Sequence, residues 1–178
     1  MAEQCCKLGS RGPFVVMDES ALKKRQEQYS KGKWLLFDEM DVGMTFPRVE
    51  FEVTRELVEK YTAAMGDDNP IFHDAATAGK AGFESPIAPP TIVCIYAIPS
   101  ALLSGFQPRV IPPPGNIHYR QEYEFLNAAR IGDTIRVKSV VLNKEMRKGK
   151  KYVTIESQYE NQDGKIIAVG RITPIWSK

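Results

Sequence analysis

The sequence predicts an α+β domain in which an antiparallel sheet wraps around one buried apolar helix. Three observations predict it: a strand followed by a helix comes first, a helical segment without any charged residue follows, and the C-terminal part alternates between apolar and polar residues as strands do. With 178 residues, the chain is long enough for one domain with a core. We expect residues 1–16 to be a flexible tail and residues 17–178 to form this single domain.

The first strand and its helix are predicted by local patterns. Apolar residues alternate with glutamates in residues 48–53, as in a half-buried strand. Thr54 then offers a hydroxyl N-cap to a helix that ends before Gly66. The apolar face of this helix should contain Leu57, Tyr61 and Ala64. A more polar helix is predicted upstream, over residues 18–31.

A second predicted helix is apolar throughout, because residues 91–98 contain no charged side chain. We therefore expect it to be buried on every side. It should begin at Pro90 or Thr91, where a proline loses no hydrogen bond, and Pro99 should kink or end it. Between the two helices, Asp67-Asp68-Asn69-Pro70 is a turn cluster that cannot continue the first helix.

Four strand-like runs fill the C-terminal part, over residues 117–125, 134–142, 152–159 and 165–175. The first run should place its apolar residues on one face: Ile117, Tyr119, Tyr123 and Phe125. Hairpin tips at Arg147-Lys148-Gly149-Lys150 and Asn161-Gln162-Asp163-Gly164 should join the later strands. Since an open sheet leaves an edge strand unpaired, we expect a dimer whose sheets continue edge to edge.

Composition excludes several classes of protein. Lys and Arg number 24 against 22 Asp and Glu, and a net charge of +2 argues against a dedicated nucleic-acid binder. No apolar run reaches the roughly 18 residues of a membrane span, and the N-terminus lacks the apolar segment of a signal peptide, so we expect a cytoplasmic protein. Three cysteines and two histidines lack zinc-site spacing, and no glycine-rich phosphate loop follows a strand. We expect neither a metal nor a nucleotide cofactor.

Three ordered segments carry a resemblance to a known family: MTFPRVEFEVTRELVEKYTAAMGDDNPIFHD, GFESPIAPPT and HYRQEYEFLNAARIGDTI. Together they resemble the N-terminal dehydratase domain of MaoC-like proteins over about residues 35–175. The resemblance implies the hot-dog fold and a lyase of fatty acid metabolism, either an (R)-specific enoyl-CoA hydratase or a 3-hydroxyacyl thioester dehydratase. It also implies a substrate carried on coenzyme A or acyl carrier protein, and a homodimer or a heterodimer with another MaoC-like chain.

The resemblance also implies roles for residues of the turn cluster. The family motif G-D-x-N-P-x-H is matched here by Gly66, Asp67, Asn69 and Pro70. Asp67 would activate water, His73 would exchange the proton at the α-carbon, and Asn69 would orient the loop. At the start of the apolar helix, the Thr91 N–H would stabilise the enolate. Ile92 and Tyr96 would line an acyl pocket, although core packing alone also explains them.

Two departures from the motif leave alternatives open. The motif places its histidine where this chain has Phe72, and His73 comes one residue later. Pro90 stands where active relatives have a glycine whose N–H binds the thioester oxygen, and proline has no N–H. The chain is therefore interpreted as a hydratase or dehydratase subunit, with two alternatives: a non-catalytic partner subunit of a two-part dehydratase, or a hot-dog thioesterase. The Asp–Asn–Pro loop favours the hydratase family over a thioesterase.

Overall fold

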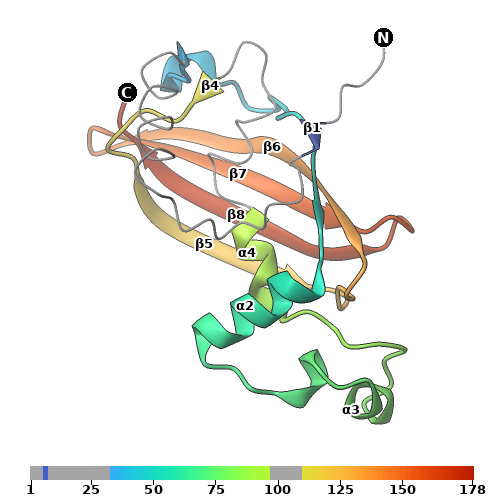
Figure 1. The fold of residues 1–178 in the computed structure, drawn as a ribbon. Coiled ribbons are helices and arrows are strands. Elements are labelled where there is room, and N and C mark those ends of the chain that lie inside the picture. The colour runs from blue at the N-terminus through green and yellow to red at the C-terminus, as the bar shows by residue number, and fades with distance from the viewer. Residues whose placement is uncertain (1–5, 8–32, 97–109) are drawn as a thin grey trace.

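A computed structural model describes residues 6–7, 33–96 and 110–178 (Figure 1). Its main sheet has the strand order β1-β3-β6-β7-β8-β5, and a small second sheet pairs β2 (Lys33–Trp34) with β4 (Val110–Ile111). The strands of the main sheet are β1 (Cys6–Lys7), β3 (Val49–Glu52), β5 (Ile117–Phe125), β6 (Thr134–Arg147), β7 (Lys150–Glu160) and β8 (Ile166–Trp176). All neighbours in this sheet are antiparallel except β1 and β3.

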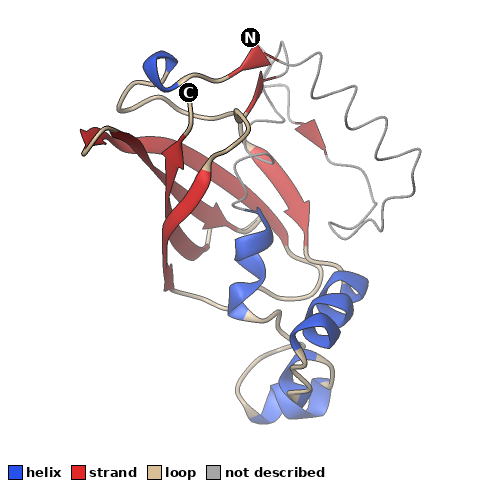
Figure 2. Cartoon of the chain, turned by 90° about the vertical axis from the view of Figure 1, so that its left-hand side faces the viewer, coloured by secondary structure: helices blue, strands red, loops and turns tan. Residues whose placement is uncertain are grey.

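The helices lie on one side of the sheet, with α4 between the sheet and α2 (Figure 2). They are α2 (Arg55–Met65), α3 (Ala75–Lys80) and α4 (Val93–Tyr96). Within the described residues, three short 3-10 turns accompany them: η1 (Phe37–Glu39), η2 (Pro70–Phe72) and η3 (Pro90–Ile92). The α+β prediction is confirmed, with its order of strand, helix, apolar helix and four strands. The predicted helix over residues 18–31 and the break at Pro99 lie outside the described residues.

The helix α2 begins and ends as predicted. The Thr54 hydroxyl accepts a hydrogen bond from the Leu57 amide at 3.1 Å, and Gly66 adopts a left-handed conformation with φ of 67°. Its predicted face is partly wrong, because Ala64 is exposed and Val58 and Thr62 are buried beside Leu57. Thr62 is tolerated in the core since its hydroxyl donates to the Val58 carbonyl at 3.0 Å.

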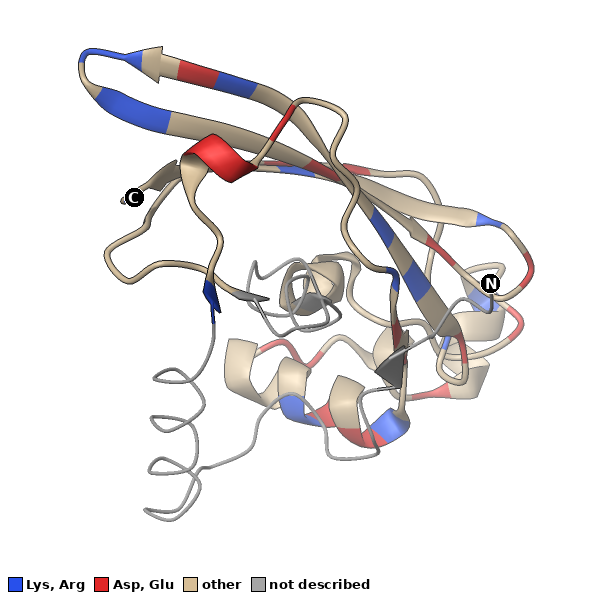
Figure 3. Cartoon of the chain, turned by 90° about the horizontal axis from the view of Figure 1, so that it is seen from above, with Lys and Arg blue, Asp and Glu red and all other residues tan. Residues whose placement is uncertain are grey.

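Both predicted hairpin tips are confirmed. Lys148 has a positive φ of 50° at the β6–β7 turn, and the Gly164 amide donates to the Asn161 carbonyl at the β7–β8 turn. The β6–β7 hairpin is long, and its tip carries a concentration of Lys and Arg that projects away from the helices (Figure 3).

The predicted single apolar face of β5 is wrong. A bulge between His118 and Arg120 shifts the register with β8. Beyond it, Tyr123 lies opposite Gly170 and Phe125 opposite Ala168, whereas Tyr119 packs its ring edge-on against Tyr152, 5.1 Å away. Most of these residues stay exposed because β5 is an edge strand: Ile117 at 55%, Tyr119 at 51% and Phe125 at 45%. An extra residue in one strand reverses the alternation that the sequence pattern assumes.

The prediction that the apolar helix is buried on every side is also wrong for its described part. Ile92 and Val93 are each 1% exposed, but Thr91 is exposed and Cys94 and Ile95 are half-buried. The described residues therefore cover only one side of this helix, the side that packs in the core with the sheet.

Candidate active site

The loop after α2 is fixed by its own hydrogen bonds. The Asp67 amide donates to the Thr62 carbonyl at 2.9 Å, and the Asp67 carboxylate accepts from the Asn69 amide at 3.2 Å. Asn69 in turn caps η2, because its side-chain oxygen accepts from the Ile71 amide at 3.1 Å. Local turn chemistry therefore positions Asp67 and Asn69 on one tight loop.

At the end of this loop, two consecutive ring-bearing residues, Phe72 and His73, have different surroundings. Phe72 is only 6% exposed and belongs to the core, whereas His73 is exposed, with the two rings edge-on at 6.5 Å. The His73 amide donates to the Pro70 carbonyl at 3.0 Å, which fixes the backbone at this point. The structure thus puts Asp67, Asn69 and His73 on one exposed loop, but no hydrogen bond joins Asp67 to His73 in the described chain.

The first turn of the apolar helix lies next to α2. The Tyr61 hydroxyl donates to the Thr91 hydroxyl at 3.0 Å, which links α2 to η3. On the other side, the Ala88 amide donates to the Ala129 carbonyl at 2.8 Å, so the chain entering this helix is held by the segment that follows β5. Ile92 is a core residue, and the side chain of Tyr96 lies outside the described residues.

Sequence reasoning missed a second polar group, which lies between α4 and the sheet. It contains Cys94 of α4, Tyr123 of β5 and Tyr159 of β7. Burial raises the pKa of all three side chains, and the Cys94 thiol and the Tyr123 hydroxyl also influence each other. Alternation in β7 does predict an inward Tyr159, but nothing in the sequence distinguishes it from an ordinary core aromatic.

Within the described ranges, no three His, Cys, Asp or Glu side chains gather closely enough to hold a metal ion. No helix in the same ranges is long and apolar enough to cross a membrane.

Residues 40–169 match the family described as the FAS1-like dehydratase domain region. The chain belongs to this family. Among curated proteins it is similar to a UPF0336 protein of Streptomyces avermitilis, with 26% identity over 132 residues, 73% of this chain and 88% of that one. A UPF0336 protein of Thermobifida fusca is 26% identical over 115 residues, 64% of this chain and 76% of that one.

Solved structures show the same hot-dog fold. R-Hydratase PhaJ1 from Pseudomonas aeruginosa superimposes with a TM-score of 0.65 at 25% identity, over 80% of this chain and 86% of that one. The (3R)-hydroxyacyl-ACP dehydratase complex HadBC from Mycobacterium tuberculosis gives 0.66 at 24% identity, over 76% and 98%. The predicted resemblance to MaoC-like dehydratases is therefore confirmed, and the chain is a hot-dog protein of the hydratase and dehydratase family.

Proposed function

We propose that the chain is a subunit of a hydratase or dehydratase that adds water reversibly to an α,β-unsaturated acyl thioester of coenzyme A or acyl carrier protein. Membership of the dehydratase family supports the reaction class. The exposed loop with Asp67, Asn69 and His73 supplies the acid and base groups that such a reaction needs.

In this reaction the Asp67 carboxylate takes a proton from water while the water oxygen bonds to the β-carbon. The electron pair of the double bond moves to the thioester carbonyl, which becomes an enolate. The Thr91 N–H donates to this enolate oxygen, and His73 delivers a proton to the α-carbon as the carbonyl forms again. Asn69 keeps the loop in shape through its hydrogen bond with the Ile71 amide, and the role assigned to Ile92 is to line the acyl pocket.

The single observation that carries a partner-dependent form of this function is the placement of Phe72 and His73. The ring at the motif position of the histidine is buried in the core, and His73, one residue later, is open to solvent. Pro90 removes a second element, an N–H donor for the enolate oxygen, and losing one such donor typically costs about 3 kcal/mol of transition-state stabilisation. Both departures favour a site that is completed by a second MaoC-like chain.

The exposed edge of the sheet offers a place for that chain. β5 pairs only with β8 among the described strands, and it exposes Ile117, Tyr119 and Phe125. A partner whose sheet continues at β5 would bury these side chains and satisfy the free backbone groups of the strand. The structures of HadBC and of the ChsH1–ChsH2 complex from Mycobacterium tuberculosis are complexes of hot-dog chains, at 24% and 13% identity to this one.

The test measures loss of enoyl absorbance with a short trans-2-enoyl-CoA. The purified chain, a MaoC-like partner with an intact G-D-x-N-P-x-H motif, and their mixture are compared, with light scattering on each sample. We expect slow or no turnover by the chain alone and strongly increased turnover by the mixture, together with a larger particle. Full turnover by this chain alone, abolished by His73→Ala, would instead make His73 a self-sufficient catalytic residue.

A further inference from the structure

A row of small and polar residues crosses the face of the sheet that packs under α4. The hydroxyls of Ser139 and Ser157 lie 2.8 Å apart and are buried. Ser157 of β7 is opposite Gly170 of β8, and Gly170 is opposite Tyr123 of β5. A sheet face that packs in a core is expected to be apolar. Polar side chains in this row are therefore unexpected for core packing alone.

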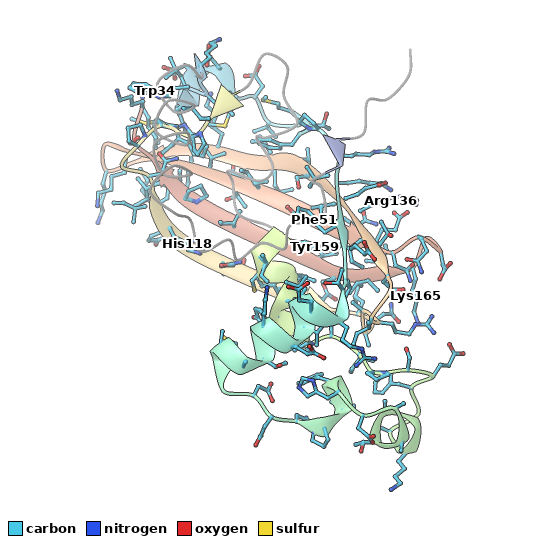
Figure 4. All side chains as sticks on the ribbon, in the orientation of Figure 1. Trp34, Phe51, His118, Arg136, Tyr159 and Lys165 are labelled. Carbon is cyan, nitrogen blue, oxygen red and sulfur yellow. The ribbon has the colours of Figure 1, made fainter. Side chains whose placement is uncertain are left out.

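Tyr159 stands next to this row with its hydroxyl unpaired. The residue is 0% exposed, and its Oη has no hydrogen-bond partner within reach in the described structure, although the hydroxyls of Tyr123 and Ser157 are near enough to influence its pKa. Figure 4 shows Tyr159 beside α4. Because a buried hydroxyl without a partner is costly, we expect a group that is not among the described residues to pair with it.

Gly170 makes room for the two tyrosine rings. A Cβ at this position would lie 2.5 Å from Cε1 of Tyr123 and 3.3 Å from Cε2 of Tyr159. The ring centroids of the two tyrosines are 6.3 Å apart, with the planes tilted by 50°. The glycine therefore lets both rings lie directly over the strand, which keeps the two hydroxyls in one small region.

A polar path leads to this region from the exposed edge of the sheet. The exposed Gln121 amide donates to the Tyr123 hydroxyl, and Tyr123 is half-buried. Cys94 approaches from α4, three residues after Thr91 and so about one helical turn from it. The polar side chains that influence the pKa of Tyr159, those of Cys94, Tyr123 and Ser157, are all neutral, because burial keeps the thiol and the phenol protonated.

We propose that the Tyr159 and Tyr123 hydroxyls form a subsite for a neutral oxygen atom in the acyl chain of the substrate, such as a hydroxyl, ether or keto oxygen. This inference rests on the proposed function and deepens it by naming the substrate class. In this subsite the oxygen of the acyl chain would lie about one helical turn from the position of the thioester carbonyl at Thr91. A carboxylate does not suit the subsite, because no cation belongs to the cluster and an unpaired buried charge is far more costly than a neutral group.

The experiment measures binding of saturated acyl-CoA compounds, which cannot react. Chains of equal length carry an ether oxygen at the fourth, fifth or sixth position, and an all-carbon chain serves as reference. Calorimetry is performed on the full chain, with and without its MaoC-like partner. We expect one ether compound to bind about tenfold more tightly than the all-carbon compound, and Tyr159→Phe to remove this preference without weakening binding of the all-carbon chain.

Tyr152→Phe is the matched control. Tyr152 is also a buried tyrosine of β7, but it packs against Tyr119 and the Arg147 side chain rather than under α4. It should keep the full preference for the ether compound. Circular dichroism checks that both variants are folded, which we expect because phenylalanine retains the ring.

Two outcomes overturn the subsite: no ether compound is preferred by the wild type, in which case the Tyr159 hydroxyl holds only a water, or the preference survives Tyr159→Phe. The proposed function fails separately. If enoyl-CoA is turned over but no binding preference depends on Tyr159, the proposed reaction is supported and the subsite is contradicted. If the binding preference depends on Tyr159 but enoyl-CoA is not turned over, the subsite is supported and the proposed reaction is contradicted.

Discussion

The loop of residues 66–73 and the cluster under α4 are two polar regions of opposite character. In the loop, Asp67, Asn69 and His73 are exposed, and the side-chain hydrogen bonds of Asp67 and Asn69 stabilise the turn itself. In the cluster, Tyr159 is fully buried, and burial raises the pKa of Tyr159, Tyr123 and Cys94. The loop carries groups typical of acid–base chemistry, and the cluster provides the dry surroundings in which such chemistry is efficient.

The chain therefore holds its acid and base groups on an exposed loop and its buried polar groups in a separate place. The link between them is short, because Tyr61 of α2 bonds to Thr91 at the start of the helix that carries Cys94. In the proposed complex, a second chain at the β5 edge would cover the exposed side chains of that strand. Substitutions that affect one region and leave the other unchanged test whether the two regions act separately.

The largest effect is expected in the loop. Asp67→Asn should lower the turnover that this chain adds to that of its partner at least about a hundredfold, because a general base typically contributes that much. The Asn side chain can still accept from the Asn69 amide, so the melting temperature should change little. Asp68→Asn is the control, because the family motif leaves that position free. Unchanged turnover with reduced stability would mean that Asp67 is only a helix stop.

The next largest effect concerns the packing of the cluster. Gly170→Ala should lower the free energy of unfolding by about 1 to 3 kcal/mol, since the added methyl group meets the Tyr123 ring and a packed core accommodates it poorly. Gly79→Ala in α3 is the control. No atom lies within 4 Å of a Cβ there and its φ is not positive, so alanine should stabilise the helix by up to about 1 kcal/mol. Urea denaturation measures both, and equal signs would contradict the packing argument.

These elements also show how far sequence reasoning reaches. Strand β3, helix α2 and the hairpin tips were predictable because each depends on neighbouring residues: alternation, the Thr54 cap, and turn residues such as Gly164. The bulge in β5 was not predictable, because one extra residue leaves the apolar composition unchanged while it reverses the side-chain directions. The buried position of Thr62 depends on how α2 meets the core, which a helical period alone does not specify.

The candidate site also contains one part that the sequence predicts and one part that it does not. A local motif located the loop, and the structure adds that Phe72 is buried while His73 is exposed. The cluster was not predictable, because its members come from α4, β5 and β7, and their relation depends on the register of Tyr123 and Ser157 across Gly170. Pairing across strands is a long-range property that single-sequence patterns do not contain.

The pH dependence of stability should separate the cluster from the surface. Tyr159 has a pKa raised above its ordinary value of 10.0. Above that pH the unfolded chain loses the proton and the folded chain retains it, so the free energy of unfolding falls by about 1.4 kcal/mol per pH unit. Cys94 acts in the same direction from its ordinary value of 9.0. Tyr159→Phe should flatten this alkaline decline in denaturation curves recorded up to pH 11, and an unchanged slope would contradict it.

At acid pH, the stability should depend on an ion pair at the surface rather than on the cluster. A hydrogen bond from Lys138 lowers the pKa of Glu160 below its ordinary value of 4.5. The stability that this pair contributes is present above pH 4.5 and is lost as the pH falls through the folded value. Glu160→Gln should therefore reduce the acid decline and leave the alkaline decline intact.

The smallest effect is expected at the helix that supports the loop. Thr54→Ala removes the side-chain acceptor of the Leu57 amide and should lower the free energy of unfolding by about 1 kcal/mol. Thr54→Ser keeps the hydroxyl and should restore most of that loss. Because the cap lies at the other end of α2 from Asp67 and outside the cluster, the alkaline decline due to Tyr159 should keep its slope in both variants. A changed alkaline slope in Thr54→Ala would show that loosening of α2 reaches the cluster through the Tyr61–Thr91 bond, and that the two regions act as one unit already within this chain.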